Sequence, residues 1–194
     1  MDVGCAWKQP IRSAMSRHPS DSRCRTDVAE RELLALVSAG DRRAMDQLYI
    51  RYFARLARFF QNTTLRADVV EELINDTMLE VWKAGESIRT NASVLPEIMR
   101  LAYSRVQKYF AEVRAGEPHS PSDEHDGEQP NRMLAKAAPA DLQIFLSKLP
   151  VKERAVVYLV YAGGCSRRET ADVMKIACDC VDALLRAAGA SAFP

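Results

Sequence analysis

The chain has 194 residues, of which 47% are hydrophobic, and this is enough to bury a core in one domain or in two small ones. Its 27 basic and 26 acidic side chains give a formal net charge of +1, so any nucleic-acid site must come from a local patch. The longest apolar run, residues 155–165, is too short to span a bilayer, and the first 25 residues lack the apolar stretch of a secretory signal. We therefore expect a cytoplasmic protein without membrane insertion.

The first 26 residues are expected to form a disordered extension, and translation could also start at Met15. Residues 27–114 are predicted to form a first helical domain. Its first helix is expected to begin at Asp27, which has capping-box spacing to Glu30, and to end at Gly40. The next helix carries apolar residues at helical spacing on one face: Met45, Leu48, Tyr52, Leu56 and Phe59.

Two further helices complete the predicted first domain. The third has an apolar face and is expected to end at Gly85. The residues on that face are Val70, Leu73, Ile74, Thr77, Met78 and Val81. The fourth helix is expected to begin near Ser93, because Pro96 is tolerated only in a first turn, and to run to Arg114.

Residues 115–139 are predicted to form a flexible acidic linker. Within them, residues 115–131 contain three prolines, two glycines and five acids, with no lysine or arginine. Such a composition cannot bury enough apolar surface to order itself. The linker separates the first domain from a second one.

Residues 140–188 are predicted to form four short helices, followed by a tail at 189–194. Ser166 and Glu169 have capping-box spacing and start a helix that ends in a tight turn. The helix after that turn has one apolar face, made by Val181, Leu184, Leu185 and Ala188. Two helices joined in this way are typical of a helix-turn-helix. Because strand-like alternation is absent from the sequence, we predict an all-α protein of two small helical domains.

Two charged helix faces are candidate binding surfaces. Glu72, Asp76 and Glu80 repeat every four residues and should repel one another on one stripe, which a basic partner would relieve. A solvated acidic face is an equally good interpretation. The fourth helix is basic and aromatic, which suits single-stranded nucleic acid, although some of its rings are expected in the core. The residues concerned are Arg100, Arg105, Lys108, Arg114, Tyr103, Tyr109 and Phe110.

Catalysis, cofactors and metals are not expected. Phosphate-binding glycine loops, metal-spaced histidine pairs and nucleophiles with a matching base are absent from the sequence. The five cysteines have no framework spacing and are expected to be free thiols. Cys165, Cys178 and Cys180 could in principle hold zinc, but no histidine follows His125 and structural zinc takes four ligands.

Two segments resemble a known family. VEELINDTMLEVWK, residues 70–83, resembles region 2.2 of bacterial sigma factors of the extracytoplasmic-function (ECF) class. LSKLPVKERAVVYLVYAGGCSRRETADVMKI, residues 146–176, resembles their region 4. The resemblance covers nearly all of residues 28–114 and 141–188 and implies a sigma-2 and a sigma-4 domain joined by a linker.

The resemblance implies partners and site residues. The partners would be core RNA polymerase, bound through its β′ coiled coil and β flap, and promoter DNA. An anti-sigma factor is a further possible partner. The β′ coiled coil would bind Glu72, Asn75, Asp76 and Glu80. The −10 element would contact Arg100, Tyr103, Ser104, Arg105 and Lys108. The −35 element would contact Arg167, Arg168, Lys175, Asp179, Asp182, Ala183 and Arg186.

Several DNA-facing positions depart from the family pattern. Glu97 stands where the family has tryptophan, and Ser104 stands where it has the asparagine that contacts an extruded base. In the last helix, Asp182 and Leu184 replace the usual basic residues, so the face of Asp179, Asp182, Ala183 and Arg186 carries a charge of −1. Carboxylates facing phosphates oppose binding, although an acid can still accept a hydrogen bond from cytosine.

The leading hypothesis is an ECF sigma factor that directs promoter-specific initiation and is not itself an enzyme. The alternative is a degenerate sigma-like regulator that acts through contacts with an anti-sigma factor or with polymerase, without reading promoters. A plain helix-turn-helix repressor would leave the first domain and its acidic stripe unexplained.

Overall fold

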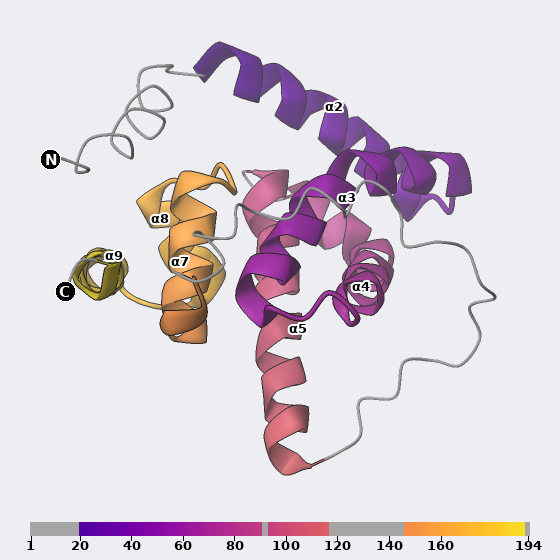
Figure 1. The fold of residues 1–194 in the computed structure, drawn as a ribbon. Helices are drawn as coiled ribbons and strands as arrows, with labels where there is room; N and C mark the ends of the chain where they lie inside the picture. The colour runs from indigo at the N-terminus through magenta and orange to yellow at the C-terminus, as the bar shows by residue number, and fades with distance from the viewer. Residues whose placement is uncertain (1–19, 91–92, 117–145, 193–194) are drawn as a thin grey trace, which may run out of the picture.

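The computed structural model describes residues 20–90, 93–116 and 146–192, and its regular elements in these ranges are all helices (Figure 1). The predicted all-α class is thereby confirmed. The elements are α2 (Ser20–Ser38), α3 (Arg42–Thr64), α4 (Val70–Thr90), α5 (Val94–Ala115), α7 (Val151–Tyr161), α8 (Arg167–Met174) and α9 (Cys178–Ala192). Most of the predicted N-terminal extension and of the predicted linker lies outside the described residues.

Helix boundaries follow local capping chemistry. The Asp41 carboxylate accepts hydrogen bonds from the backbone N–H groups of Arg43 and Ala44 and so starts α3. α5 begins after Ser93, as its sequence predicts. At the start of α8 the Ser166 hydroxyl accepts from the Glu169 N–H and the Glu169 carboxylate accepts from the Ser166 N–H. The predicted capping box is therefore present in full.

The first helix differs from its prediction. α2 begins at Ser20, so Asp27 lies inside the helix and does not cap it. Glu30, the other half of the predicted capping box, is buried, and its Oε2 accepts a hydrogen bond of 2.7 Å from the Tyr52 hydroxyl of α3. The prediction was wrong because the carboxylate of Glu30 binds a neighbouring helix instead of its own backbone.

Gly85 does not end α4, which continues to Thr90. A Cβ atom at Gly85 would lie 3.0 Å from the Ser38 hydroxyl oxygen and 3.6 Å from Val37 Cγ1, both in α2. The residue is therefore a glycine because two helices approach each other closely there. A helix-ending glycine and a close-packing glycine look the same in a single sequence.

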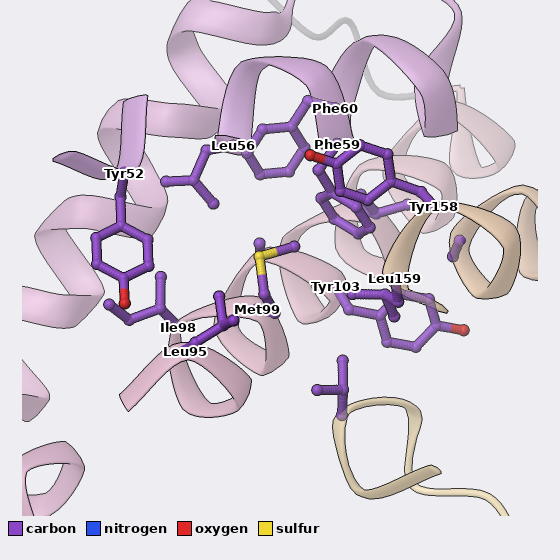
Figure 2. Packing of buried hydrophobic residues seen from close by; sticks show 14 of the residues in the cluster. Tyr52, Leu56, Phe59, Phe60, Leu95, Ile98, Met99, Tyr103, Tyr158 and Leu159 are labelled. Atoms are coloured by element: carbon purple, nitrogen blue, oxygen red, sulfur yellow. The ribbon is translucent and has the colours of Figure 1, made fainter. Parts of the chain in front are cut away.

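The two helical blocks, α2–α5 and α7–α9, share one apolar core. The face predicted for α4 is buried in full, and most of the face predicted for α3 is buried as well. The same cluster includes Tyr158 and Leu159 of α7 beside Phe59 and Met99 of the first block (Figure 2). A small second cluster consists of Leu146, Leu149 and Ala188. Among the described helices, none is both long and apolar enough to cross a membrane.

Polar contacts join the blocks as well. The Tyr158 hydroxyl donates to the backbone carbonyl of Arg55 at 2.8 Å, and the rings of Tyr158 and Phe59 lie 5.5 Å apart. The buried Arg154 donates from Nε to the carbonyl of Thr63 at 3.0 Å and from Nη1 to that of Leu149 at 3.1 Å. Burial lowers the pKa of Arg154 from its usual value. These contacts place α7 against α3.

Candidate polymerase and nucleic-acid interface

The acidic stripe lies on the outer side of α4, between α3 and α5. Thr77 and Met78 of α4 are buried and face the core, so the opposite side of the helix faces solvent. Glu72, Asp76 and Glu80 are half-buried, and Asn75 is exposed. The four residues that the family resemblance assigns to polymerase therefore share one accessible strip. Their contact with polymerase stays a prediction.

The α3 side of this strip is partly apolar. The Tyr49 hydroxyl donates to Asn75 Oδ1 at 3.0 Å, and burial together with the nearby Glu71 carboxylate raises the pKa of Tyr49. Beside them is a surface depression lined by Met45, Tyr49, Asn75, Met78, Leu79 and Trp82. The sequence reasoning did not single out Leu79, an exposed leucine. Its position on an otherwise polar helix face was the available signal.

The α5 side of the strip is an ion-pair cluster. The Arg105 guanidinium pairs with the Asp76 carboxylate and lies 3.5 Å (Nη1 to Oε1) from Glu80. The Arg105 side chain is only 15% exposed, whereas those of Asp76 and Glu80 are each 37% exposed. The structure thus brings together residues that sequence reasoning had placed in two different sites, one for polymerase and one for DNA.

The remaining residues predicted to contact the −10 element divide into accessible and covered ones. Ser104 and Lys108 are exposed on α5. Arg100 pairs with Glu97 on the same helix, with Nη2 and Oε2 2.8 Å apart. Tyr103 is only 4% exposed, and burial raises its pKa. It belongs to the shared core, and α5 packs against α8 of the second block.

The helix-turn-helix is present as predicted, with α8 and α9 joined by a turn. Lys175 caps α8 in the left-handed conformation, and its N–H donates to the carbonyls of Ala171 and Asp172. Buried Val173 and Val181 pack the two helices into the core. The residues predicted to contact the −35 element that are exposed are Arg167, Arg168, Lys175, Asp179, Ala183 and Arg186. Their contact with DNA stays a prediction.

Asp182 is not an isolated negative charge on this surface. Its Oδ1 forms an ion pair with Arg167 of α8, with Oδ1 and Nε 2.9 Å apart, and Arg186 Nε donates to the Asp182 backbone carbonyl at 3.3 Å. With Tyr161 and Leu185 these residues line a surface depression. The charge of −1 obtained from the sequence counted only residues of α9. It therefore left out Arg167 of α8, which pairs with Asp182.

The cysteines that the structure describes do not form one cluster. Cys165 is buried in the turn before α8, whereas Cys178 and Cys180 are exposed at the start of α9. Within the described ranges, no cluster of three or more histidine, cysteine or acidic side chains is arranged to hold a metal ion.

Comparisons with known proteins place this fold. The chain is 29% identical over 153 residues to the ECF RNA polymerase sigma factor SigM of Mycobacterium tuberculosis, strains H37Rv and Erdman. The match covers 79% of this chain and 77% of SigM. No protein-family profile matches the chain.

Two solved structures have a similar fold. One is CnrH in complex with the cytosolic domain of CnrY, with a TM-score of 0.63 and 22% identity. It covers 84% of this chain and 94% of CnrH. The other is the sigma factor RpoE in complex with the anti-sigma factor NepR from Bartonella quintana, with a TM-score of 0.56 and 18% identity. It covers 76% of this chain and 92% of RpoE.

In sequence and in fold the chain is similar to bacterial sigma factors, which are transcription initiation factors and not enzymes. Among sigma factors, the sequence relatives are of the ECF class, and the expected resemblance to that class is confirmed.

Proposed function

We propose that the protein binds core RNA polymerase and directs promoter-specific transcription initiation. The observation that carries this proposal is the extent of the relationship to SigM, because 153 matched residues are too many to lie in one helical block alone. The match therefore includes parts of both blocks, and each block carries residues proposed below for polymerase and for DNA.

Polymerase would dock on the outer strip of α4. Asp76 and Glu80 keep accessible oxygens that can accept hydrogen bonds from basic side chains of the β′ coiled coil. Leu79 and the depression beside it supply apolar area next to these charges. The β flap would bind the second block, α7–α9.

Promoter DNA would be read by α5 and by the helix-turn-helix. Ser104 and Lys108 are accessible for the −10 element, and Arg168 and Lys175 are accessible for phosphates near the −35 element. Tyr103 can stack on a base only after the second block moves away from α5, since it is buried in the shared core. Reading of the −10 element would therefore accompany separation of the two blocks.

In vitro transcription tests the proposal. The full-length protein is added to core polymerase on a template that carries its own upstream region and on a pool of genomic fragments. We expect defined transcripts that are absent with core polymerase alone. The double variant Asp76→Asn, Glu80→Gln should lose them. A matched control, Glu32→Gln with Asp46→Asn, removes the same charge from exposed sites on α2 and α3 and should retain them.

A second candidate function is a sigma-like regulator that acts through protein contacts alone. The burial of Tyr103 favours it, because a non-reading protein has no need to expose that ring. The complexes of CnrH with CnrY and of RpoE with NepR support a regulatory protein partner for this chain too, under either function. Core binding without any transcript on the fragment pool would favour this second candidate.

A further inference from the structure

The Arg105 guanidinium of α5 faces two carboxylates of α4 at once, those of Asp76 and Glu80. Nη2 pairs with Asp76 Oδ2, and Nη1 lies 3.5 Å from Glu80 Oε1. A guanidinium presents five N–H groups in a rigid plane and can hold two carboxylates, which a lysine ammonium does less well. The charge of Arg105 is therefore already paired with carboxylates of the protein itself.

Contact with a DNA phosphate would require Arg105 to leave both partners. Asp76 and Glu80 lie one helical turn apart on α4, where like charges repel, and they would be left beside the incoming phosphate. Lys108 is the better placed cation on α5. Its side chain is 61% exposed, and its ion pair is with Glu112 of the same helix at 3.6 Å. An exposed pair of this kind contributes little and is easily exchanged for a phosphate.

We propose that Arg105 is a positioning residue of the polymerase-binding strip and does not contact promoter DNA. This inference rests on the proposed function. Arg105 offsets the repulsion between Asp76 and Glu80 and fixes their side chains, so that their outward oxygens face the polymerase in one arrangement. Ordering these side chains in advance lowers the entropy that docking would otherwise lose.

The sign of the change in affinity for core polymerase distinguishes a positioning role of Arg105 from a purely electrostatic one. Removing Arg105 makes the strip more negative by one charge, and attraction to a basic partner surface alone would then increase. Loss of positioning predicts the opposite, a weaker complex. We expect Arg105→Gln to weaken binding of core polymerase by about fivefold to tenfold, and Arg105→Lys to restore part of the loss.

The experiment measures the affinity of the full-length protein for core polymerase, and then the affinity of the assembled holoenzyme for promoter DNA at several salt concentrations. Lys108→Gln is the matched control, because it removes one charge from the same helix. We expect it to leave core affinity within about twofold and to lower the salt dependence of DNA binding. Arg105→Gln should leave that salt dependence unchanged once the holoenzyme is saturated.

A double-mutant cycle isolates the role of the carboxylates. With Asp76→Asn and Glu80→Gln already present, Arg105→Gln should have much less effect on core affinity, because nothing remains to position. An unchanged or higher core affinity for Arg105→Gln, or a lower salt dependence of its DNA binding, would overturn the inference alone. If Asp76→Asn with Glu80→Gln does not weaken core binding, the polymerase-binding strip itself is wrong, and the inference fails with it.

Thermal unfolding of each variant shows whether a loss of affinity is a loss of fold. If Arg105→Gln is unfolded at the assay temperature, Arg105→Lys carries the test, since it keeps a cation near Asp76. Arg105→Lys should then bind core polymerase less tightly than the wild type with an unchanged DNA salt dependence, and core affinity equal to the wild type would overturn the inference.

Discussion

The Tyr158 hydroxyl donates a hydrogen bond of 2.8 Å to the backbone carbonyl of Arg55, which joins α7 of the second block to α3 of the first. The two residues are 103 positions apart in the chain. The Tyr158 ring also packs 5.5 Å from that of Phe59. One side chain thus combines an apolar and a polar contact across the boundary between the blocks.

Tyr158→Phe should destabilise the protein modestly. The variant keeps the ring but leaves the Arg55 carbonyl without its donor, which typically costs about 1 kcal/mol. For a chain of this length that corresponds to a fall of roughly 2–4 °C in the midpoint of thermal unfolding. The control is Tyr161→Phe on the same helix, where the side chain is 57% exposed, and we expect no measurable change. Equal shifts for the two variants would contradict this account.

The raised pKa of Tyr158 predicts that the free energy of unfolding falls at alkaline pH. Burial raises the pKa of Tyr158 from 10.0 to about 12, so the folded protein holds this proton more tightly than the unfolded chain does. The stabilisation is complete below pH 10 and is lost as the pH rises from about 10 to 12. Urea unfolding of the wild type and Tyr158→Phe over this range measures it. The difference between their unfolding free energies should narrow as the pH rises, and a constant difference would count against this assignment.

Local patterns predicted most of the helices because local contacts determine them. The helical spacing of Leu48, Tyr52 and Leu56 indicates a buried face, whichever helix packs against that face. The capping box of Ser166 and Glu169 is complete within four residues. Glu72, Asp76 and Glu80 share a strip for the same reason, since helical spacing alone sets it.

The contacts that the sequence did not predict are long-range. Tyr158 and Arg154 look like ordinary residues of their own helix, and only the fold shows that they bind α3. The pairs of Arg105 with Asp76 and of Arg167 with Asp182 each join two helices. A count of charges along one helix cannot find them, because each partner is drawn from another helix.

The shared core predicts how the protein behaves after proteolysis. We expect a protease to cut first between Arg114 and Arg132, in the segment that composition predicts to be flexible. The two fragments should then remain associated under native conditions, because Phe59, Met99 and Leu159 are buried in one cluster. Gel filtration followed by mass spectrometry of the nicked protein checks this. Separation of the fragments without denaturant would show that the shared core is too weak to hold them.

The pairing of Asp182 with Arg167 changes what Asp182→Lys should do. If α9 lies in the major groove, Asp182 repels the phosphates and also pairs with a cation that could bind them, since its Oδ1 lies 2.9 Å from Arg167 Nε. Lysine at this position removes the negative charge, adds a positive one and leaves Arg167 available. Affinity for duplex DNA should rise for many sequences alike, and the log–log dependence on salt should steepen by roughly one to two units.

The measurement uses the full-length protein, because a fragment of the second block alone would expose Tyr158 and Leu159 to water. Duplex binding is titrated at several salt concentrations for the wild type, Asp182→Lys and the control Asp46→Lys. The control makes the same change in net charge at an exposed position of α3, away from the helix-turn-helix. We expect a weakly binding wild type, a clear gain for Asp182→Lys and little change for Asp46→Lys. An equal gain for both variants would indicate non-specific attraction, and no binding by any of the three would remove the −35 reading role from α9.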